Sequence, residues 1–278
     1  MFSGRKLVIA TKHSKELVMA PLLEAELGVQ CIIPDNFDTD QFGTFSGEIA
    51  RLDDPFTTAR NKCLMAMNMM NCDLAVASEG SFGPHPTAFF TYADDEFVLL
   101  LDRKNNLEIF GRAISMDTNF SGRVINTNEE LALFASEVGF PDHAIILRNS
   151  QNASDFIVKG ITDWDQLLNN FQKVIEKFGT AFAEADMRAL YNPKRMKIIE
   201  IATKNLIEKV NSFCPACQMP GFSIRDSKPG LPCSLCDRPT RTTLAHVLGC
   251  SYCSFSKEIL YPNGMFTEDP GFCDYCNP

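Results

Sequence analysis

Eight cysteines near the C-terminus form four identical pairs with two residues between the thiols: Cys214 and Cys217, Cys233 and Cys236, Cys250 and Cys253, and Cys273 and Cys276. Two intervening residues let one tight turn aim both sulfurs at a single cation, and two such turns complete a tetrahedral shell of four thiolates. The four turns therefore predict two metal sites. We expect two structural Zn²⁺ ions, and an iron–sulfur cluster is the alternative because it also uses four thiolates.

The pairing of the four turns has two candidate solutions. The segments between them contain 15, 13 and 19 residues. We favour sequential pairing, first with second and third with fourth, which gives two consecutive zinc ribbons. The turn-forming Pro-Gly dipeptides at 220–221 and 229–230 lie in the first segment. Nested pairing, second with third and first with fourth, stays open.

A second set of residues could bind an anion. Thr11, Lys12, His13, Ser14 and Lys15 lie between an expected strand and an expected helix. Backbone N–H groups and the helix dipole favour a phosphate at a helix N-terminus, and two lysines add positive charge. The competing interpretation is a solvated helix start capped by Ser14.

Two glycine-rich segments carry candidate acids. Glu48 lies in the polar stretch 42–51 and could be a metal ligand, although an ordinary surface loop is at least as plausible. Glu79, Ser81 and His85 lie in a segment that follows an expected strand, where Gly80 permits a tight turn. Glu79 could hold Mg²⁺ or act as a general base, and Ser81 and His85 could contact substrate. A histidine fixed by its own turn is an equal alternative for His85.

A charged segment precedes the last expected helix of the first two hundred residues. Arg188 and Arg195 could clamp a phosphate bidentately. The alternative is a salt-bridged, solvated helix surface.

The elements that would position these side chains alternate in type. Strands are expected at 6–11, 29–33 and 73–78, with helices starting near Ser14 and at Asp54-Pro55 between them. This order predicts parallel strands covered by helices. Strands at 96–103 and 107–115 should form a hairpin, further strands are expected at 144–148 and 156–161, and helices at 127–138, 163–178 and 193–211. We predict an α/β domain over 1–211 and a small zinc-binding domain over 212–278.

Composition limits the functions that are open. The 278 residues are 45% hydrophobic and 22% charged, which is typical of a folded globular protein. The formal net charge of −9 disfavours general binding of nucleic acid. Residues 212–278 carry five basic and six acidic side chains, so we expect the ribbons to stabilise the fold or contact a protein. No apolar run is long enough to span a membrane and no secretion signal is visible, so a cytoplasmic location is expected.

Long strings of the chain resemble a bacterial family of zinc-ribbon-tailed domains of unknown function. They are residues 78–86 (SEGSFGPHP), residues 186–189 (DMRA) with Asn192-Pro193, and the cysteine pairs ending in Cys276-Asn277-Pro278. This resemblance implies no established activity.

Residues 5–211 also resemble the inosine-triphosphate pyrophosphatases and Maf-like nucleotide pyrophosphatases. The similar segments are 11–15, Thr58-Ala59 followed by Lys62-Cys63, Glu79-Gly80-Ser81, and 186–188. The resemblance implies a mixed-sheet, three-layer α/β domain that binds a phosphorylated ligand, with Lys62 among its substrate-binding residues.

Three functions follow, in decreasing order of preference. The first is a Mg²⁺-dependent hydrolase of a nucleotide or related phosphate compound, with Lys15, Glu48 and Glu79 as its catalytic residues. The substrate-binding residues would be Thr11, Lys12, His13, Lys62, Ser81, His85, Arg188 and Arg195. The second is a phospho-ligand-binding protein without catalysis whose ribbons recruit a protein partner. The third, nucleic-acid processing, is disfavoured by the acidic balance.

Overall fold

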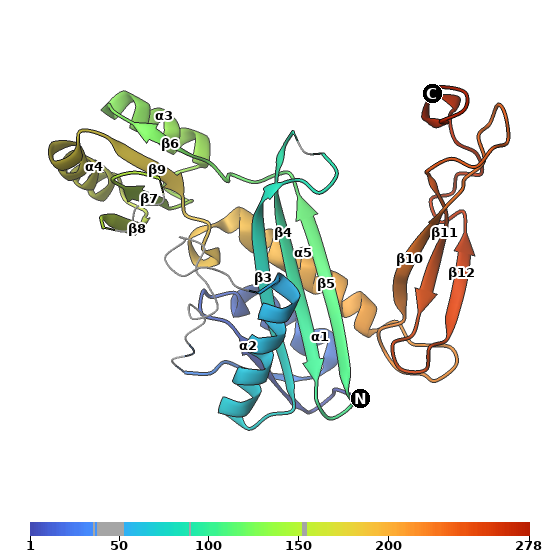
Figure 1. Cartoon of the computed structure of the whole chain (residues 1–278). Coiled ribbons are helices and arrows are strands. Elements are labelled where there is room, and N and C mark those ends of the chain that lie inside the picture. Colours follow the sequence, from blue (N-terminus) through green and yellow to red (C-terminus); the bar gives the residue numbers. More distant parts are fainter. Residues whose placement is uncertain (36, 38–52, 89, 152–154) are drawn as a thin grey trace. The chain divides into compact units, whose positions relative to one another are not determined.

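A computed structural model describes residues 1–35, 37, 53–88, 90–151 and 155–278. The chain divides into two compact units, Met1–Ile207 and Glu208–Pro278 (Figure 1). The first unit contains two sheets and the second unit contains a three-stranded sheet.

The first unit contains a five-stranded mixed sheet with the order β2-β1-β3-β4-β5. Its strands are β1 (Lys6–Ala10), β2 (Gln30–Ile32), β3 (Leu74–Pro84), β4 (Tyr92–Asp102) and β5 (Leu107–Ser115). β1 is parallel to β2 and β3, whereas β3, β4 and β5 are antiparallel to one another. The chain moves from β1 to β2 on one side and returns to β3 on the other. The carboxyl ends of β1 and β3 therefore form the kind of switch point at which open α/β sheets bind ligands.

Helices cover both faces of this sheet (Figure 1). α2 (Pro55–Met70) packs on the face that carries Ala75, Ala77 and Leu99. α1 (Glu16–Leu27) and α5 (Pro193–Val210) lie on the opposite face. α5 approaches β5 closely, since a Cβ on Gly111 would lie 2.2 Å from the carbonyl oxygen of Ala202.

The predicted helix start at Asp54-Pro55 is confirmed, whereas the predicted cap at Ser14 is not. The Asp54 side chain accepts N–H bonds from residues 56 and 57 at the start of α2, and Gly28 ends α1 with a φ of 64°. The expected Ser14 cap is wrong. Ser14 has a φ of 57°, Lys15 occupies the N-cap position, and no side chain caps the helix.

A second, antiparallel sheet in the first unit has the order β6-β9-β7-β8. Its strands are β6 (Gly122–Ile125), β7 (Ile145–Arg148), β8 (Ile157–Ile161) and β9 (Ala181–Ala185). Helices α3 (Asn128–Val138) and α4 (Trp164–Phe178) share its hydrophobic core through Leu131, Phe134, Leu167 and Phe171. β6 and β9 were not predicted, whereas β7 and β8 lie where strands were expected.

β3 and β4 are longer than their apolar cores predicted. Residues 78–84 continue β3, where we had expected a glycine-rich turn, and β4 begins at Tyr92. The polar ends of the two strands pair with each other, with Phe82 opposite Asp94 and Gly80 opposite Glu96. Backbone pairing therefore extends each strand past the end of its hydrophobic run.

The second unit is built on a three-stranded antiparallel sheet. β10 (Ser223–Pro229), β11 (Thr243–Gly249) and β12 (Ser256–Leu260) follow one another in sequence and in space. Side chains of β12 are exposed along the whole strand. Across the described residues of both units, no helix is long and apolar enough to cross a membrane.

Candidate functional site

Four cysteine sulfurs converge at each of two places in the second unit. One cluster contains Cys214, Cys217, Cys250 and Cys253, and the other contains Cys233, Cys236, Cys273 and Cys276. All four sulfurs of a cluster lie within 4.8 Å of one another. The closest pairs are 3.6 and 3.7 Å apart in the first cluster and 3.8 and 3.9 Å apart in the second. Four sulfurs placed 2.3 Å from a central ion in a tetrahedron lie about 3.8 Å apart, so each cluster can hold one metal ion.

The pairing of the turns corrects the sequential arrangement that we favoured and also excludes the nested one. The first turn joins the third, and the second joins the fourth. The reason is the sheet. β10 and β11 are antiparallel with Ser223 opposite Gly249, so the turn before β10 and the turn after β11 meet at one end. β10 and β12 finish at the other end, where the second and fourth turns meet.

Three of the four turns have the same backbone form. The residue after the second cysteine, which is Gln218, Asp237 or Ser254, has a φ between 58° and 60°. The N–H groups of Leu235 and Tyr252 each point at the sulfur of the first cysteine of their pair, 3.4 Å away. Such N–H groups stabilise a thiolate, which is the form that binds a metal.

The pKa values of two thiols in the second cluster are shifted in opposite directions. Backbone N–H groups of Cys276 and Tyr275 lower the pKa of Cys273 to about 7. The sulfur contact with Cys236 raises the pKa of Cys276 to about 12. A divalent ion would favour all four thiolates together.

In the first unit, charged side chains are buried at the carboxyl ends of β1 and β3. Lys15 is 7% exposed, and its Nζ donates to Ser78 Oγ at 2.9 Å and to the Ser78 carbonyl at 3.3 Å. Burial and the nearby Arg195 charge lower the pKa of Lys15 to about 7. The predicted anion-binding lysine is therefore part of the protein interior at this edge, and Ser78 is its partner.

Lys62 and Glu79 form a buried ion pair next to Lys15. Lys62, on α2, donates from Nζ to Glu79 Oε1 on β3, and both side chains are at most 10% exposed. The charges of both residues contribute to the pKa of Lys15. The structure thus brings together three predicted residues, but it pairs Glu79 with a cation instead of leaving it as a solvated acid.

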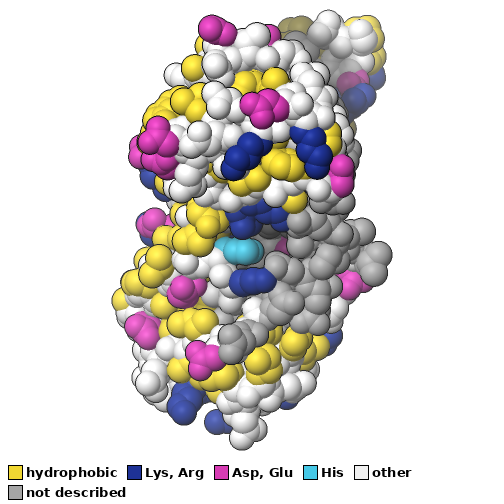
Figure 2. Space-filling model, turned by 90° about the vertical axis from the view of Figure 1, so that its left-hand side faces the viewer, with side chains coloured by type: hydrophobic (Ala, Val, Ile, Leu, Met, Phe, Trp, Pro, Cys, Tyr) yellow, Lys and Arg dark blue, Asp and Glu magenta, His cyan; other side chains and the backbone are white. Residues whose placement is uncertain are grey.

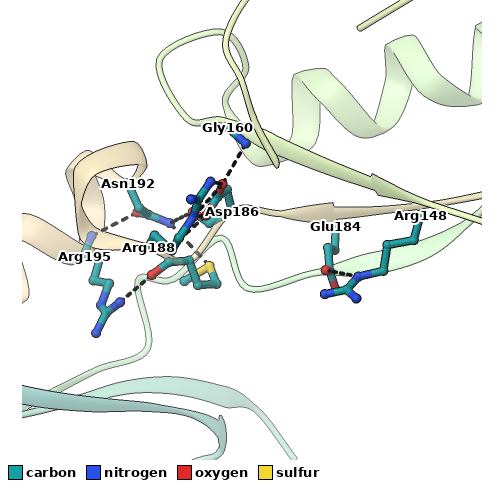
Figure 3. Close-up of polar contacts among 8 residues, drawn as sticks. Arg148, Gly160, Glu184, Asp186, Arg188, Asn192 and Arg195 are labelled. Atoms are coloured by element: carbon teal, nitrogen blue, oxygen red, sulfur yellow. Dashed lines mark hydrogen bonds and ion pairs between the residues drawn. The ribbon is translucent and has the colours of Figure 1, made fainter. Parts of the chain in front are cut away.

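Arg195, in the first turn of α5, is buried on the opposite face of the sheet from the Lys62–Glu79 pair. Its Nε donates to Glu96 Oε1 at 2.5 Å, and neither side chain is exposed. Its Nη1 donates to the carbonyl of Met187, and its backbone N–H donates to Asn192 Oδ1 (Figure 3). The guanidinium carbon also lies 5.2 Å from the ring centre of Phe82. Arg195 is therefore a fixed, buried cation.

Two acids that the sequence analysis missed lie beside Arg195. Asp94 and Glu96 are 2% and 0% exposed and lie two residues apart on β4, on the same face. Burial and the charge of Glu96 raise the pKa of Asp94 to about 8. Asp94 Oδ1 and Glu96 Oε2 are buried without a hydrogen-bond partner among the described residues. Asp94 and Glu96 alternate at the start of an apolar strand, and this pattern is visible in the sequence. The predicted strand began at residue 96, so Asp94 lay outside it.

Gly80 makes room for the Glu96–Arg195 pair. It lies directly opposite Glu96 on β3. A Cβ at this position would lie 2.2 Å from Glu96 Oε1 and 2.7 Å from an Arg195 nitrogen. The glycine thus provides space for a buried ion pair, which corrects its expected role in a tight turn.

The Thr11–Lys15 segment borders an open cavity. Thr11, Lys12, Ser14 and Glu16 line a space of about 410 Å³ together with Ile33, Pro34 and Phe37. Lys12 is exposed and His13 is half-buried. Thr11 is buried, and its Oγ1 has no hydrogen-bond partner among the described residues. Figure 2 shows Lys and Arg side chains gathered next to a histidine near the middle of one face.

The remaining predicted residues lie apart from these contacts. Arg188 binds Asp186, with its closest nitrogen 2.6 Å from Oδ2, and lies 4.5 Å from the Tyr191 ring centre (Figure 3). His85 Nδ1 accepts N–H bonds from residues 87 and 88, which is the turn-bound alternative. Ser81 is exposed on β3. Glu48 lies outside the described residues.

Comparison with known families decides where the chain belongs. Residues 62–278 match a family model described as a domain of unknown function, DUF6671. The chain belongs to the DUF6671 family. A search of curated proteins finds no match. The matched part of the DUF6671 protein contains Lys62, Glu79, Glu96, Arg195 and all eight metal-site cysteines, while Lys15 precedes it.

Proposed function

We propose that the first unit of this DUF6671 protein binds a phosphorylated small molecule at the carboxyl ends of β1 and β3 and hydrolyses it with the help of a divalent cation. The observation that carries this proposal is the burial of five charged side chains on both faces of the sheet near its switch point, namely Lys15, Lys62, Glu79, Glu96 and Arg195. Burying charges costs several kcal/mol per ion, so proteins concentrate such groups where they act on a ligand.

The basic groups have distinct tasks in this proposal. Lys12 lines the open cavity beside the start of α1, where its positive charge and the helix dipole attract the phosphate. Lys15 and Arg195 are buried and are not among the cavity-lining residues, so they stabilise charge on the phosphoryl oxygens through their electric field and not by direct contact. Because Lys15 has a pKa of about 7, it can also take up or release a proton near neutral pH.

The acids on β4 fit a hard divalent cation such as Mg²⁺. Asp94 Oδ1 and Glu96 Oε2 are buried carboxylate oxygens without a partner among the described residues, and oxygen is the ligand that Mg²⁺ prefers. Glu79 is a weaker candidate ligand because Lys62 already engages it. When bound, the cation supplies charge neutralisation and a water of lowered pKa.

The test is a turnover assay on the full chain with nucleoside triphosphates and inorganic pyrophosphate in the presence of Mg²⁺. Released phosphate and pyrophosphate identify the bond that breaks. We expect Lys15→Met and Glu96→Gln to lower kcat/KM at least a hundredfold, while Lys204→Met, at an exposed i,i+4 ion pair, leaves it unchanged. No turnover above background, or full activity of Lys15→Met, contradicts the proposal.

One contact favours a second candidate, a phospho-ligand-binding protein without catalysis. The buried Lys62–Glu79 pair neutralises the acid that would otherwise act as the base. In that case the same compounds stabilise the protein against heat, as any ligand of the native state does, but they are recovered unchanged. Analysis of the products after prolonged incubation separates the two functions.

We propose that both cysteine clusters hold zinc and that their role is structural. Four sulfurs within 4.8 Å fit one ion, whereas the thiolates of an iron–sulfur cluster bind different iron atoms. Four protein ligands leave no open position for catalysis. Exposed apolar side chains beside the second cluster, Leu235, Phe272 and Tyr275, suit a protein contact. Elemental analysis of the purified protein should give two zinc ions per chain, and iron with visible absorbance contradicts this assignment.

A further inference from the structure

A second cavity of the first unit has aromatic walls and one acid. Its lining residues come from β4, β6, β9 and the segments next to them, so both sheets of the unit contribute. The volume is about 360 Å³, and the lining consists of Tyr92, Phe120, Ser121, Gly122, Gln151, Phe182 and Glu184. Aromatic walls with a few polar groups are typical of small-molecule sites.

A buried arginine fixes the acid of this cavity. Arg148 is 3% exposed, and its Nε donates to Glu184 Oε1 at 2.7 Å (Figure 3). The Glu184 side chain is 27% exposed, and its other oxygen, Oε2, makes no hydrogen bond within the described part of the chain. A carboxylate only accepts hydrogen bonds, so a ligand at Oε2 must carry N–H or O–H donors. The negative end of this ion pair is therefore the end that a ligand can reach.

The aromatic rings add a preference for positive charge. Tyr92 is 56% exposed and Phe120 is 38% exposed, so both rings keep surface that a ligand can contact. The face of an aromatic ring carries partial negative charge and attracts a cation. The same aromatic group already contacts one cation of the protein, since the Arg195 guanidinium lies 5.2 Å from the ring centre of Phe82, which stacks on Phe120.

The charges around the cavity also favour a cation. Among the described residues that line it, Glu184 is an acid and none is basic. Arg148 and Arg195 lie behind the lining, and each is buried and paired with a glutamate. An anion would face the Glu184 carboxylate with no basic lining group to offset the repulsion. This cavity therefore has the opposite charge preference from the anion site proposed above.

A glycine keeps the space beside the carboxylate open. Gly122 on β6 is directly opposite Glu184 on β9. A Cβ at residue 122 would lie 2.9 Å from the Phe182 ring and 3.2 Å from the Glu184 Cβ. A larger side chain would occupy the space between the ring and the acid.

We propose that this cavity binds an organic cation through an alkylammonium group. The ammonium N–H groups donate to Glu184 Oε2, and the adjoining CH₂ groups, which share the positive charge, lie against the rings of Tyr92 and Phe120. The proposal is independent of the phosphate site, because the two cavities have no lining residue in common.

The test is an NMR titration of the full chain with butylammonium and with 1-butanol, which has a similar shape and no charge. We expect butylammonium to bind at least about tenfold more tightly, since the cation–π contact and the charge-assisted hydrogen bond both require the charge. The amide signals of Gly122 and Glu184 should shift during the titration. A capped glycine pentapeptide with one central lysine identifies the source of the group: tighter binding than butylammonium indicates a lysine side chain, and equal or weaker binding indicates a free amine.

Two variants and a control locate the contacts. Glu184→Gln keeps an oxygen that can accept from Arg148 but removes the negative charge, so it should lower butylammonium affinity about tenfold. Tyr92→Leu should lower this affinity about threefold, as expected for one exposed cation–π contact, and leave 1-butanol affinity unchanged. Phe90→Leu, at a side chain that is 94% exposed and outside the cavity lining, is the matched control and should change neither affinity.

Three outcomes overturn the proposal. They are equal affinity for butylammonium and 1-butanol, absence of butylammonium binding, and full butylammonium affinity of Tyr92→Leu. If Glu184→Gln does not fold, Tyr92→Leu decides alone, because its side chain is more than half exposed. Retained 1-butanol binding by Tyr92→Leu shows that this variant is folded.

Discussion

Substitution of Gly80 by alanine tests the buried Glu96–Arg195 pair directly. The new Cβ would lie 2.2 Å from Glu96 Oε1, closer than any real Cβ contact, and the Glu96–Arg195 pair has no exposed surface into which it can move. Overpacking alone costs about 1–3 kcal/mol, and separating a buried ion pair costs about 3–5 kcal/mol. We therefore expect Gly80→Ala to lower the free energy of unfolding of the first unit by about 3 kcal/mol.

Gly83 on the same strand provides the matched control. A Cβ there meets no described atom within 4 Å, and the residue has no left-handed backbone. Gly83→Ala should be neutral or stabilise by up to about 1 kcal/mol, because alanine restricts the unfolded chain. The single tryptophan, Trp164 on α4, lies in the first unit, so its fluorescence during urea unfolding reports on that unit alone.

Neutral surface substitutions change the free energy of unfolding by up to about 0.5 kcal/mol. If the values for Gly80→Ala and Gly83→Ala differ by no more than this, the buried clash is refuted. A second comparison locates the cause. In a protein that already carries Glu96→Gln, Gly80→Ala should lower the free energy of unfolding by less than it does in the wild type. The reason is that the ion pair with Arg195 is already lost in that background. An unchanged cost in that background would mean that the clash is with other atoms.

Three further results are expected. Asp94 has a raised pKa of about 8, so the native state binds one more proton than the unfolded chain between pH 4 and pH 8. The free energy of unfolding of the wild type should therefore fall relative to that of Asp94→Asn across this window and then level off. Urea unfolding at each pH measures this difference. Cys214→Ser with Cys253→Ser should leave one metal ion per chain, whereas Cys214→Ser with Cys236→Ser should leave none, as counted by elemental analysis. Arg5→Leu should destabilise the first unit by about 3 kcal/mol in the same unfolding assay, because it leaves a buried aspartate of β4 unpaired.

Each of these results has an outcome that contradicts it. A pH-independent difference between wild type and Asp94→Asn would place that carboxyl in solvent. Loss of only one ion from Cys214→Ser with Cys236→Ser would restore the sequential pairing of the turns. Arg60→Ala, at an ion pair whose side chains are 46% and 33% exposed, should lower the free energy of unfolding by under about 1 kcal/mol. If Arg5→Leu lowers it by no more than this, burial does not strengthen the Arg5 ion pair.

Local patterns predicted the helices better than the strands. Asp54-Pro55 marked a helix start because caps act within one turn of the chain. Residues 78–84 were mistaken for a turn because their glycines and polar side chains carry no strand pattern of their own. Only pairing with residues 92–98 keeps them extended, and such pairing is not visible in a local window.

The candidate site was predicted in part for the same reason. Lys15, Lys62, Glu79 and Arg195 were chosen for their positions beside predicted elements, and all four are buried, but the Lys62–Glu79 pair and Arg195 lie on opposite faces of the sheet. Asp94 and Glu96 were missed because their importance comes from burial under α5, which the order of residues does not reveal. Arg188 had the same residue type as Arg195, yet it binds Asp186 instead.

The sequence by itself determined that eight thiols form two four-cysteine shells, because two residues between cysteines limit each pair to one turn and four turns make two shells. It could not determine which turns meet, since that depends on which ends of three antiparallel strands coincide. It also could not tell that Gly80 provides space for an ion pair, because the two charges come from residues 96 and 195. Spacing acts along the chain, whereas burial and charge pairing act between segments that only the tertiary structure brings together.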